Sequence, residues 1–191
     1  MRSSADGFDR AIAEAVRRIT DATAEVPTGI VPIILIDGRS GSGKTTLAGA
    51  VRAAWPGEMS VVALDDIYPG WGGLAEGAAT ARTAVLEPIA AGRDAHWRRW
   101  DWASGEPGTP MTTPAGTPLI IEGCGALTAE SAALAPIRVW IESPAQERRR
   151  RALARDGETF RPHWEMWAAQ EVRHIAADDP IAHATIHVEV P

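Results

Sequence analysis

"LIDGRSGSGKTTLAGA", residues 35–50, decides the fold: an apolar run ends in a glycine-rich segment that leads into a helical pattern. Residues 38–45 follow the pattern G-x-x-x-x-G-K-[ST], which is typical of a loop that wraps phosphate groups. Glycines let the backbone turn its N–H groups inward, and the N-terminus of the following helix adds a partial positive charge. The stretch therefore predicts a strand, a phosphate-binding loop and a helix, and with them a site for a nucleoside triphosphate.

Each side chain of this loop has an expected part. We expect Lys44 to reach the β- and γ-phosphates as a point charge, and the Thr45 hydroxyl to ligate Mg²⁺. The sequence lacks the N-K-x-D pattern that GTPases use for guanine. The expected cofactors are ATP and Mg²⁺, and the preference for ATP over GTP stays open. The expected phosphate contacts are Gly38, Arg39, Ser40, Gly41, Ser42, Gly43, Lys44, Thr45 and Thr46.

Bulk composition limits the possible partners. The length of 191 residues suits one domain, and the net charge of −6 argues against general nucleic-acid binding because no overall basic field attracts a polyanion. Cys124 is the only cysteine and fits a reducing compartment. No apolar run reaches ~18 residues, so no membrane span is expected. These observations favour a cytoplasmic protein without a nucleic-acid or membrane partner.

Short apolar strands alternate with helical stretches along the chain, a pattern typical of an α/β fold with a mostly parallel sheet. We expect a single domain over residues 1–191, opened by an N-terminal helical segment at 1–29. The predicted strands are 31–37, 60–64, 118–121, 137–141 and 185–190. The predicted helices are 8–22, 44–54, 78–91, 144–155 and 162–177.

Residues 92–117 interrupt this alternation. They are rich in Gly, Pro and Thr and also carry Trp97, Trp100 and Trp102. We expect a long loop on the substrate side, because connections of this length in compact domains are often functional. The alternatives are a flexible insertion without a role, or tryptophan rings that pack only against one another.

Acidic residues follow two predicted strands. Asp65 and Asp66 end the second strand and Glu122 ends the third, at the sheet edge where ligands of open parallel sheets bind. Adjacent side chains on extended backbone point to opposite faces, so only one of the two aspartates is expected in the site. A carboxylate there can accept a hydroxyl proton and help hold Mg²⁺. The alternative is that these acids merely end their strands.

A cluster of arginines follows the fourth strand. On a helix that begins at Pro144, Arg148, Arg151 and Arg155 share one face, and Asp156-Gly157 suits a break. We expect residues 144–160 to form a lid that brings positive charge over a transferring phosphoryl group. A solvated basic face is the alternative.

The remaining aromatic and imidazole side chains carry weaker expectations. Trp164 and Trp167 follow the lid, and core packing is favoured over an adenine clamp or a lid hinge. His163 and His174 are expected at the surface.

Three segments together resemble the uridine kinase/phosphoribulokinase-type branch of the P-loop kinases: GRSGSGKTT (38–46), LDDIY (64–68) and ERRRRALARD (147–156). A weaker fourth likeness is RRWDW (98–102), and the order holds over about residues 31–190. The resemblance implies a three-layer P-loop sandwich with strand order 2-3-1-4-5, helices on both faces and an arginine-bearing lid.

The resemblance also implies roles for individual residues. Asp65 matches the catalytic Asp, Tyr68 a wall of the substrate pocket, and Arg151 and Arg155 the lid contacts to phosphate, with Lys44 completing the catalytic set. The expected further phosphate contact is Arg148, the expected metal ligands are Thr45, Asp65 and Glu122, and the expected substrate contacts are Asp65, Tyr68, Trp71, Arg99, Trp100, Asp101 and Glu122.

Three departures from the family pattern bear on the acceptor. Ile67 replaces a Phe, Trp100 replaces a Tyr and so loses a hydroxyl, and residues 72–80 hold no H-P-x-x-F-D segment. Losing hydrogen-bonding groups changes which substrate a pocket accepts. We therefore expect a kinase of a small hydroxylated molecule, with a nucleoside as the first candidate. A nucleotide, sugar, vitamin precursor or antibiotic stays open, as does an ATP-binding regulatory module without an acceptor.

Overall fold

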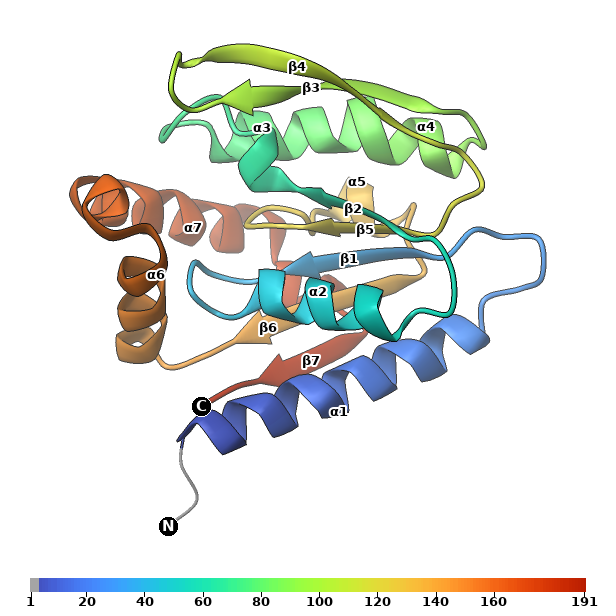
Figure 1. Ribbon diagram of the computed structural model, residues 1–191, viewed down its shortest axis with the longest axis horizontal. Helices are drawn as coiled ribbons and strands as arrows, with labels where there is room; N and C mark the ends of the chain where they lie inside the picture. The colour runs from blue at the N-terminus through green and yellow to red at the C-terminus, as the bar shows by residue number, and fades with distance from the viewer. Residues whose placement is uncertain (1–3) are drawn as a thin grey trace.

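β1 (Ile33–Asp37) is the central strand of a five-stranded parallel sheet in the computed structural model, which describes residues 4–191 (Figure 1). The sheet order is β2-β5-β1-β6-β7, which is 2-3-1-4-5 when only these strands are counted along the chain. Every neighbouring pair is parallel, so the predicted α/β fold is confirmed. The other strands are β2 (Ser60–Ala63), β5 (Leu119–Glu122), β6 (Ile137–Glu142) and β7 (Ile186–Glu189).

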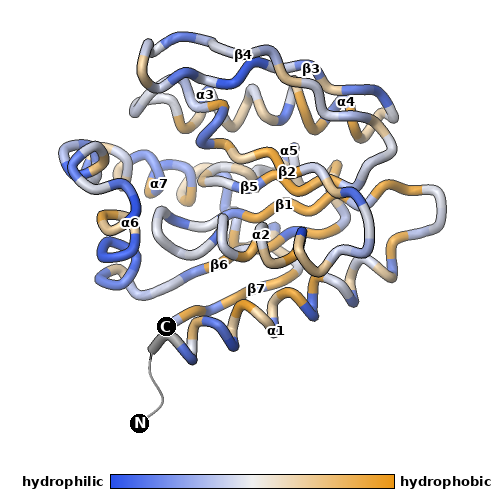
Figure 2. The backbone as a smooth tube through the Cα atoms, in the orientation of Figure 1, coloured by the Kyte–Doolittle hydropathy of each residue, from blue (hydrophilic) through white to orange (hydrophobic). Residues whose placement is uncertain are grey.

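Helices cover both faces of this sheet (Figure 1), whose strands are largely hydrophobic along their length (Figure 2). Ile34 and Ile36 face a core shared with α1 (Ser4–Ala24) and α2 (Lys44–Ala54). Ile33 and Leu35 face the opposite core. That second core is covered by α3 (Leu74–Thr80), a π-helical stretch (Ala81–Leu86), α4 (Glu87–Ala90) and α7 (Trp164–Asp178). Two further short helices are α5 (Ala129–Ala132), between β5 and β6, and α8 (Pro180–His183), between α7 and β7.

The prediction of a long loop at 92–117 is wrong. β3 (Ala95–Asp101) and β4 (Glu106–Thr113) pair antiparallel as a separate two-stranded sheet, with a register shift between Arg98 and Trp100. The side chain of Trp97 is buried in the core, and its Nε1 donates to Thr113 Oγ1 at 3.2 Å. Prolines suggested a loop, yet an isolated edge strand tolerates proline because its outer N–H groups need no partner.

The lid segment forms α6 (Ala145–Phe160), which is kinked at Gly157, where φ is 56° and ψ is −134°. Glycine alone adopts this conformation at little cost, so the break lies where Asp156-Gly157 predicts it. A 3-10 turn (Arg161–His163) then leads into α7. Among the residues described, no helix has the length and apolar content to cross a membrane.

Candidate active site

The phosphate-binding loop folds tightly between β1 and α2. Gly41 has φ 76°, and a Cβ there would lie 2.0 Å from the carbonyl oxygen of Arg148, so only glycine fits against the lid helix. Gly43 precedes α2 in a left-handed conformation, and no side chain caps the helix. The first amides of a helix have no partner within it. The loop therefore presents backbone N–H groups and a helix N-terminus to an anion.

The ammonium group of Lys44 already has hydrogen-bond partners within the loop. Its Nζ donates to the carbonyls of Gly38 at 2.8 Å and Arg39 at 3.1 Å, and lies 3.4 Å from Cys124 Sγ. Burial by itself lowers the pKa of Lys44, but the surrounding Cys124 and carboxylates outweigh that effect and raise the pKa above its ordinary value. The side chain is thus a permanent cation beneath the position expected for the phosphates.

Thr45 and Glu122 meet at the end of the loop. The Thr45 hydroxyl donates to Glu122 Oε1 at 2.9 Å, because β5 pairs with β1 in a register that sets Glu122 beside Ile36. Burial raises the pKa of the Glu122 carboxyl, Lys44 opposes this rise, and the charge of Asp65 adds to it. A hydroxyl and a buried carboxylate in contact are ligand types that Mg²⁺ takes.

The two adjacent aspartates separate as expected. Both lie in a 3-10 turn (Leu64–Asp66) directly after β2. The side chain of Asp65 lines the cavity above the loop, whereas Asp66 forms an ion pair with Arg99 at 3.3 Å. Asp65 is therefore the aspartate that faces the site, and Arg99 is held away from it.

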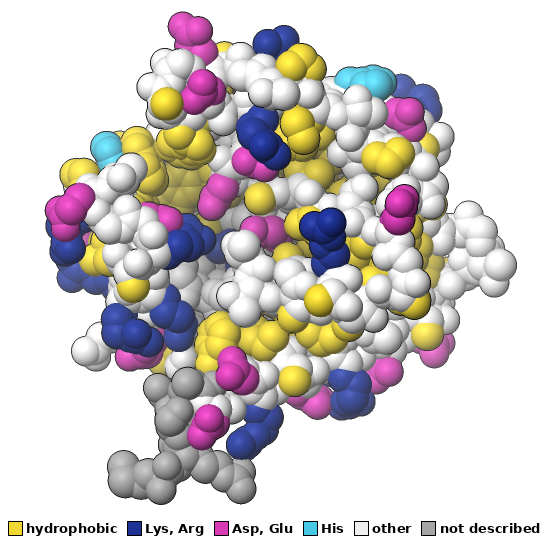
Figure 3. Space-filling view, in the orientation of Figure 1, with side chains coloured by type: hydrophobic (Ala, Val, Ile, Leu, Met, Phe, Trp, Pro, Cys, Tyr) yellow, Lys and Arg dark blue, Asp and Glu magenta, His cyan; other side chains and the backbone are white. Residues whose placement is uncertain are grey.

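The cavity has a volume of about 880 Å³ and extends from the loop to an aromatic wall. Its mouth is hollowed between the lid and the β3–β4 hairpin (Figure 3). The predicted site residues that line it are Ser40, Gly41, Gly43, Lys44, Thr45, Thr46, Asp65, Tyr68, Trp71, Glu122, Arg151 and Arg155. One cavity thus joins the phosphate-binding loop to residues that the sequence predicts as acceptor contacts.

The three lid arginines play different parts. Arg155 lines the cavity, and its guanidinium lies 3.8 Å from the Asp65 carboxylate. Arg151 also lines it, and donates to the carbonyl of Gly41 at 2.8 Å. Arg148 is buried outside it, where it donates to the carbonyl of Ser143 at 3.1 Å. Arg148 as a phosphate contact stays a prediction, and in this arrangement the side chain lies outside the cavity and contacts Ser143 and Glu142.

Aromatic rings form the wall opposite the loop. Trp71 stacks on Phe160 with ring centroids 5.3 Å apart and contacts Trp102 at 4.8 Å. Tyr68 is fully buried and its hydroxyl donates to the carbonyl of Cys124 at 2.7 Å. Trp167 packs edge-on against Tyr68 at 4.8 Å, so its predicted core packing is confirmed. The wall is therefore a connected cluster with Trp102 at its exposed edge.

Trp100 and Asp101 do not reach the cavity. Trp100 lies within the hairpin opposite Pro107, and Asp101 accepts the N–H of Ala103 at 2.9 Å in the hairpin turn. Trp102 lines the cavity where these two residues were expected, and its Nε1 donates to the carbonyl of Asp65 at 2.8 Å. The correction follows from the register shift in β3, which sequence spacing does not show.

Sequence reasoning missed a buried network under the loop. The carboxylate of Asp37 accepts the N–H groups of Gly38 at 2.6 Å and Leu127 at 2.9 Å, and lies 3.0 Å from His174 Nε2. His174 also contacts Asp178 at 2.8 Å. Its predicted surface position is wrong, because α7 turns this face onto the sheet edge. The i, i+4 spacing of His174 and Asp178 was the available signal.

Two further contacts to the loop were also missed. Glu171, buried on α7, accepts the N–H of Ser40 at 2.7 Å. Phe8 of α1 lines the cavity beside Gly43, and the Arg151 guanidinium lies over its ring, 5.2 Å from the ring centre. The active-site wall is therefore built partly by the N-terminal helix.

Compared by sequence, the chain matches no protein-family model and no curated protein. Several solved structures are similar to it in fold. In two of them the match covers 92% of this chain and 98% of the other chain, at 16% identity. One is a possible uridine kinase from Bacillus stearothermophilus, with a TM-score of 0.67. The other is a putative fructose transport system kinase from Silicibacter sp. TM1040, with a TM-score of 0.53. Such low identity is evidence of fold alone: the chain has a uridine kinase-like P-loop kinase fold.

Proposed function

We propose that this protein is an ATP-dependent kinase that transfers the γ-phosphoryl group to a hydroxyl of a small molecule, with nucleosides as the first acceptor class to test. The observation that carries the proposal is the single cavity of about 880 Å³ in which the loop, Asp65, Arg155 and an aromatic wall meet. A protein that only senses ATP has no need of an aromatic compartment beside the γ-phosphate position.

The proposed chemistry is in-line transfer. The loop amides and Lys44 bind the β- and γ-phosphates. Asp65 accepts the proton of the acceptor hydroxyl while the oxygen of that hydroxyl forms a bond to the γ-phosphorus. The bond from that phosphorus to the β,γ-bridging oxygen breaks, and ADP leaves. Arg155 and Arg151 stabilise the charge on the transferring group.

Thr45 and Glu122 are the residues that would hold Mg²⁺, with Asp65 in the same cavity. Their fit to a cation rests on the buried carboxylate of Glu122, whose pKa is raised by burial and further by the charge of Asp65. When bound, the ion neutralises negative charge on the β- and γ-phosphates.

The aromatic wall supports an acceptor with a ring-shaped body. Trp102 contributes a flat apolar face, and such faces favour stacking on bases or sugars, while Trp71 is stacked on Phe160 and His163 and supports Trp102 from behind. Trp102 is 40% exposed and so has surface left for a ligand. The name of the first structural neighbour, a possible uridine kinase, agrees with a nucleoside acceptor.

The test is a coupled assay of ADP release with MgATP and a panel of nucleosides, sugars and small alcohols. We expect at least one acceptor to stimulate ADP release above basal hydrolysis, and Lys44→Ala to abolish the stimulation. ATP binding with no stimulation by any acceptor would instead favour a regulatory ATP-binding module. Failure to bind ATP would contradict the assignment of the loop itself.

A further inference from the structure

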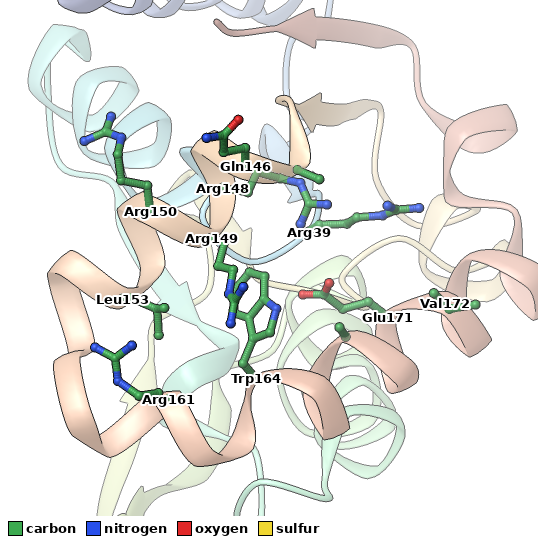
Figure 4. Close-up of a pocket in the computed structure, with 12 residues that line it drawn as sticks. Arg39, Gln146, Arg148, Arg149, Arg150, Leu153, Arg161, Trp164, Glu171 and Val172 are labelled. Carbon is green, nitrogen blue, oxygen red and sulfur yellow. The ribbon is translucent and has the colours of Figure 1, made fainter.

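A second cavity, of about 700 Å³, lies on the far side of the lid, between α6 and α7 (Figure 4). It shares no lining residue with the candidate active site. The arginines in its wall are Arg39, Arg148, Arg149, Arg150 and Arg161. Such a concentration of guanidinium groups in a concave site, in a chain with a net charge of −6, calls for an explanation.

Two of these arginines already have close hydrogen-bond or ion-pair partners within the protein. Arg148 is buried and lies 3.1 Å from Glu142 as well as bonding to the Ser143 carbonyl. Arg150 pairs with Glu147 at 2.8 Å, and its guanidinium points away from the cavity in Figure 4. Neither is available to a ligand.

The other three carry charge that is poorly compensated. Within residues 4–191, no hydrogen bond or ion pair involves Arg149. Arg39 approaches Glu142 only to 3.8 Å, and its buried Nε has no hydrogen-bond partner in this same range. Arg161 has one exposed ion pair, with Glu158, of a kind that contributes little. Guanidinium groups in this state suit a phosphate or carboxylate, whose oxygens match their donor geometry.

The rest of the cavity wall is largely apolar and includes the flat ring of Trp164 together with Leu153 and Val172. Glu171 is the one acidic residue in the wall, and its buried carboxylate is turned to the N–H of Ser40. A ligand of this cavity therefore meets cations on one side and an aromatic face on the other.

We propose that this cavity binds a phosphate-bearing small molecule with a flat ring, of the nucleotide class, at a site separate from the phosphate-binding loop. The phosphate lies between Arg149 and Arg39, and the ring lies against Trp164. Arg149 lies on α6 and Trp164 begins α7, so the ligand contacts both helices. The proposal does not require that the protein be a kinase.

The test is calorimetry on the full chain. The loop is first saturated with Mg²⁺ and a non-hydrolysable ATP analogue, and AMP or inorganic phosphate is then titrated. We expect a second, one-to-one binding event for AMP that is at least about tenfold tighter than for phosphate. Arg149→Ala should weaken AMP binding by about tenfold or more, since a charge-assisted hydrogen bond is lost. Arg150→Ala is the matched control and should leave it unchanged.

Several outcomes would overturn the proposal. They are the absence of a second binding event, equal affinity for AMP and phosphate, or AMP binding that Arg149→Ala leaves intact, as expected if AMP sits in the acceptor cavity. Arg149 is exposed, so Arg149→Ala should fold. Arg149→Gln is a second variant that removes the charge but keeps more of the side chain than alanine does. If the ATP analogue itself fails to bind, the loop assignment fails, while the AMP titration still reports on this cavity.

Discussion

The carboxylate of Asp65, directly after β2, lies 3.8 Å from the guanidinium of Arg155 on the lid helix α6. Both side chains are more than half exposed, so this ion pair contributes little to stability. Its importance is positional, because it sets the proposed proton acceptor beside a cation at one edge of the cavity.

Replacing the proposed base separates chemistry from binding. Asp65→Asn keeps the shape of the side chain but cannot accept the proton, so we expect kcat to fall by about 10²–10⁴-fold. Binding of an ATP analogue, measured by calorimetry, should change little. Asp66→Asn is the matched control, because Asp66 pairs with Arg99 outside the cavity. The kcat of this variant should stay near the wild-type value. Near-normal turnover of Asp65→Asn would refute the base assignment.

Lys44 is the only lysine in the sequence, so acylation by an amine-reactive ester reports on this side chain directly. Its raised pKa and burial leave little free amine, since each unit of pKa lowers that fraction tenfold. Mass spectrometry of the peptide that contains Lys44 should show labelling more than about tenfold slower in the native protein than in urea. Rapid native labelling would show that the Nζ is not held as described.

Gly41→Ala tests the tight contact between the loop and the lid. The new Cβ would lie 2.0 Å from the Arg148 carbonyl at φ 76°, a strain that costs about 1–3 kcal/mol. We expect a lower free energy of unfolding in urea and weaker ATP binding. Gly49→Ala, exposed on α2 with nothing within 4 Å of the new Cβ, should instead stabilise the protein by about 0.5–1 kcal/mol.

His174 makes stability depend on pH. Burial opposes its charge, but the hydrogen bonds and charges of Asp37 and Asp178 outweigh this and raise its pKa above 6.5. A raised folded-state pKa gives stability that is fully present below 6.5 and is lost as pH rises through the folded-state pKa.

His174→Gln should therefore lower the free energy of unfolding by about 1–3 kcal/mol at mildly acidic pH, and by less at alkaline pH. Urea denaturation across this range measures the difference. His96→Gln, exposed on the hairpin, serves as the control. A difference between His174→Gln and wild type that is independent of pH would contradict the charged state proposed for His174.

Local patterns predicted much of the fold and the phosphate side of the site. The G-x-x-x-x-G-K-[ST] spacing, the apolar strands and the acids at their ends all act over a few residues, so the loop, Lys44, Thr45 and Asp65 lie where they were expected. The kink at Gly157 is equally local, since it depends on one residue without a side chain.

The acceptor side was less predictable. A register shift in β3 moves Trp100 and Asp101 away from the cavity and brings Trp102 to Asp65, and strand register depends on pairing rather than on residue type. Arg148 shares a helix face with Arg151, yet the close approach of the loop turns it into a structural contact.

The sequence by itself determined that this chain has a parallel α/β sheet with a phosphate-binding loop at the end of its first strand, because the periodicity and loop chemistry involved are properties of short segments. Only the tertiary structure decided which side chains surround that loop. Glu171, His174 and Phe8 come from helices distant in the sequence, and their positions follow from how α1 and α7 pack against the two faces of the sheet.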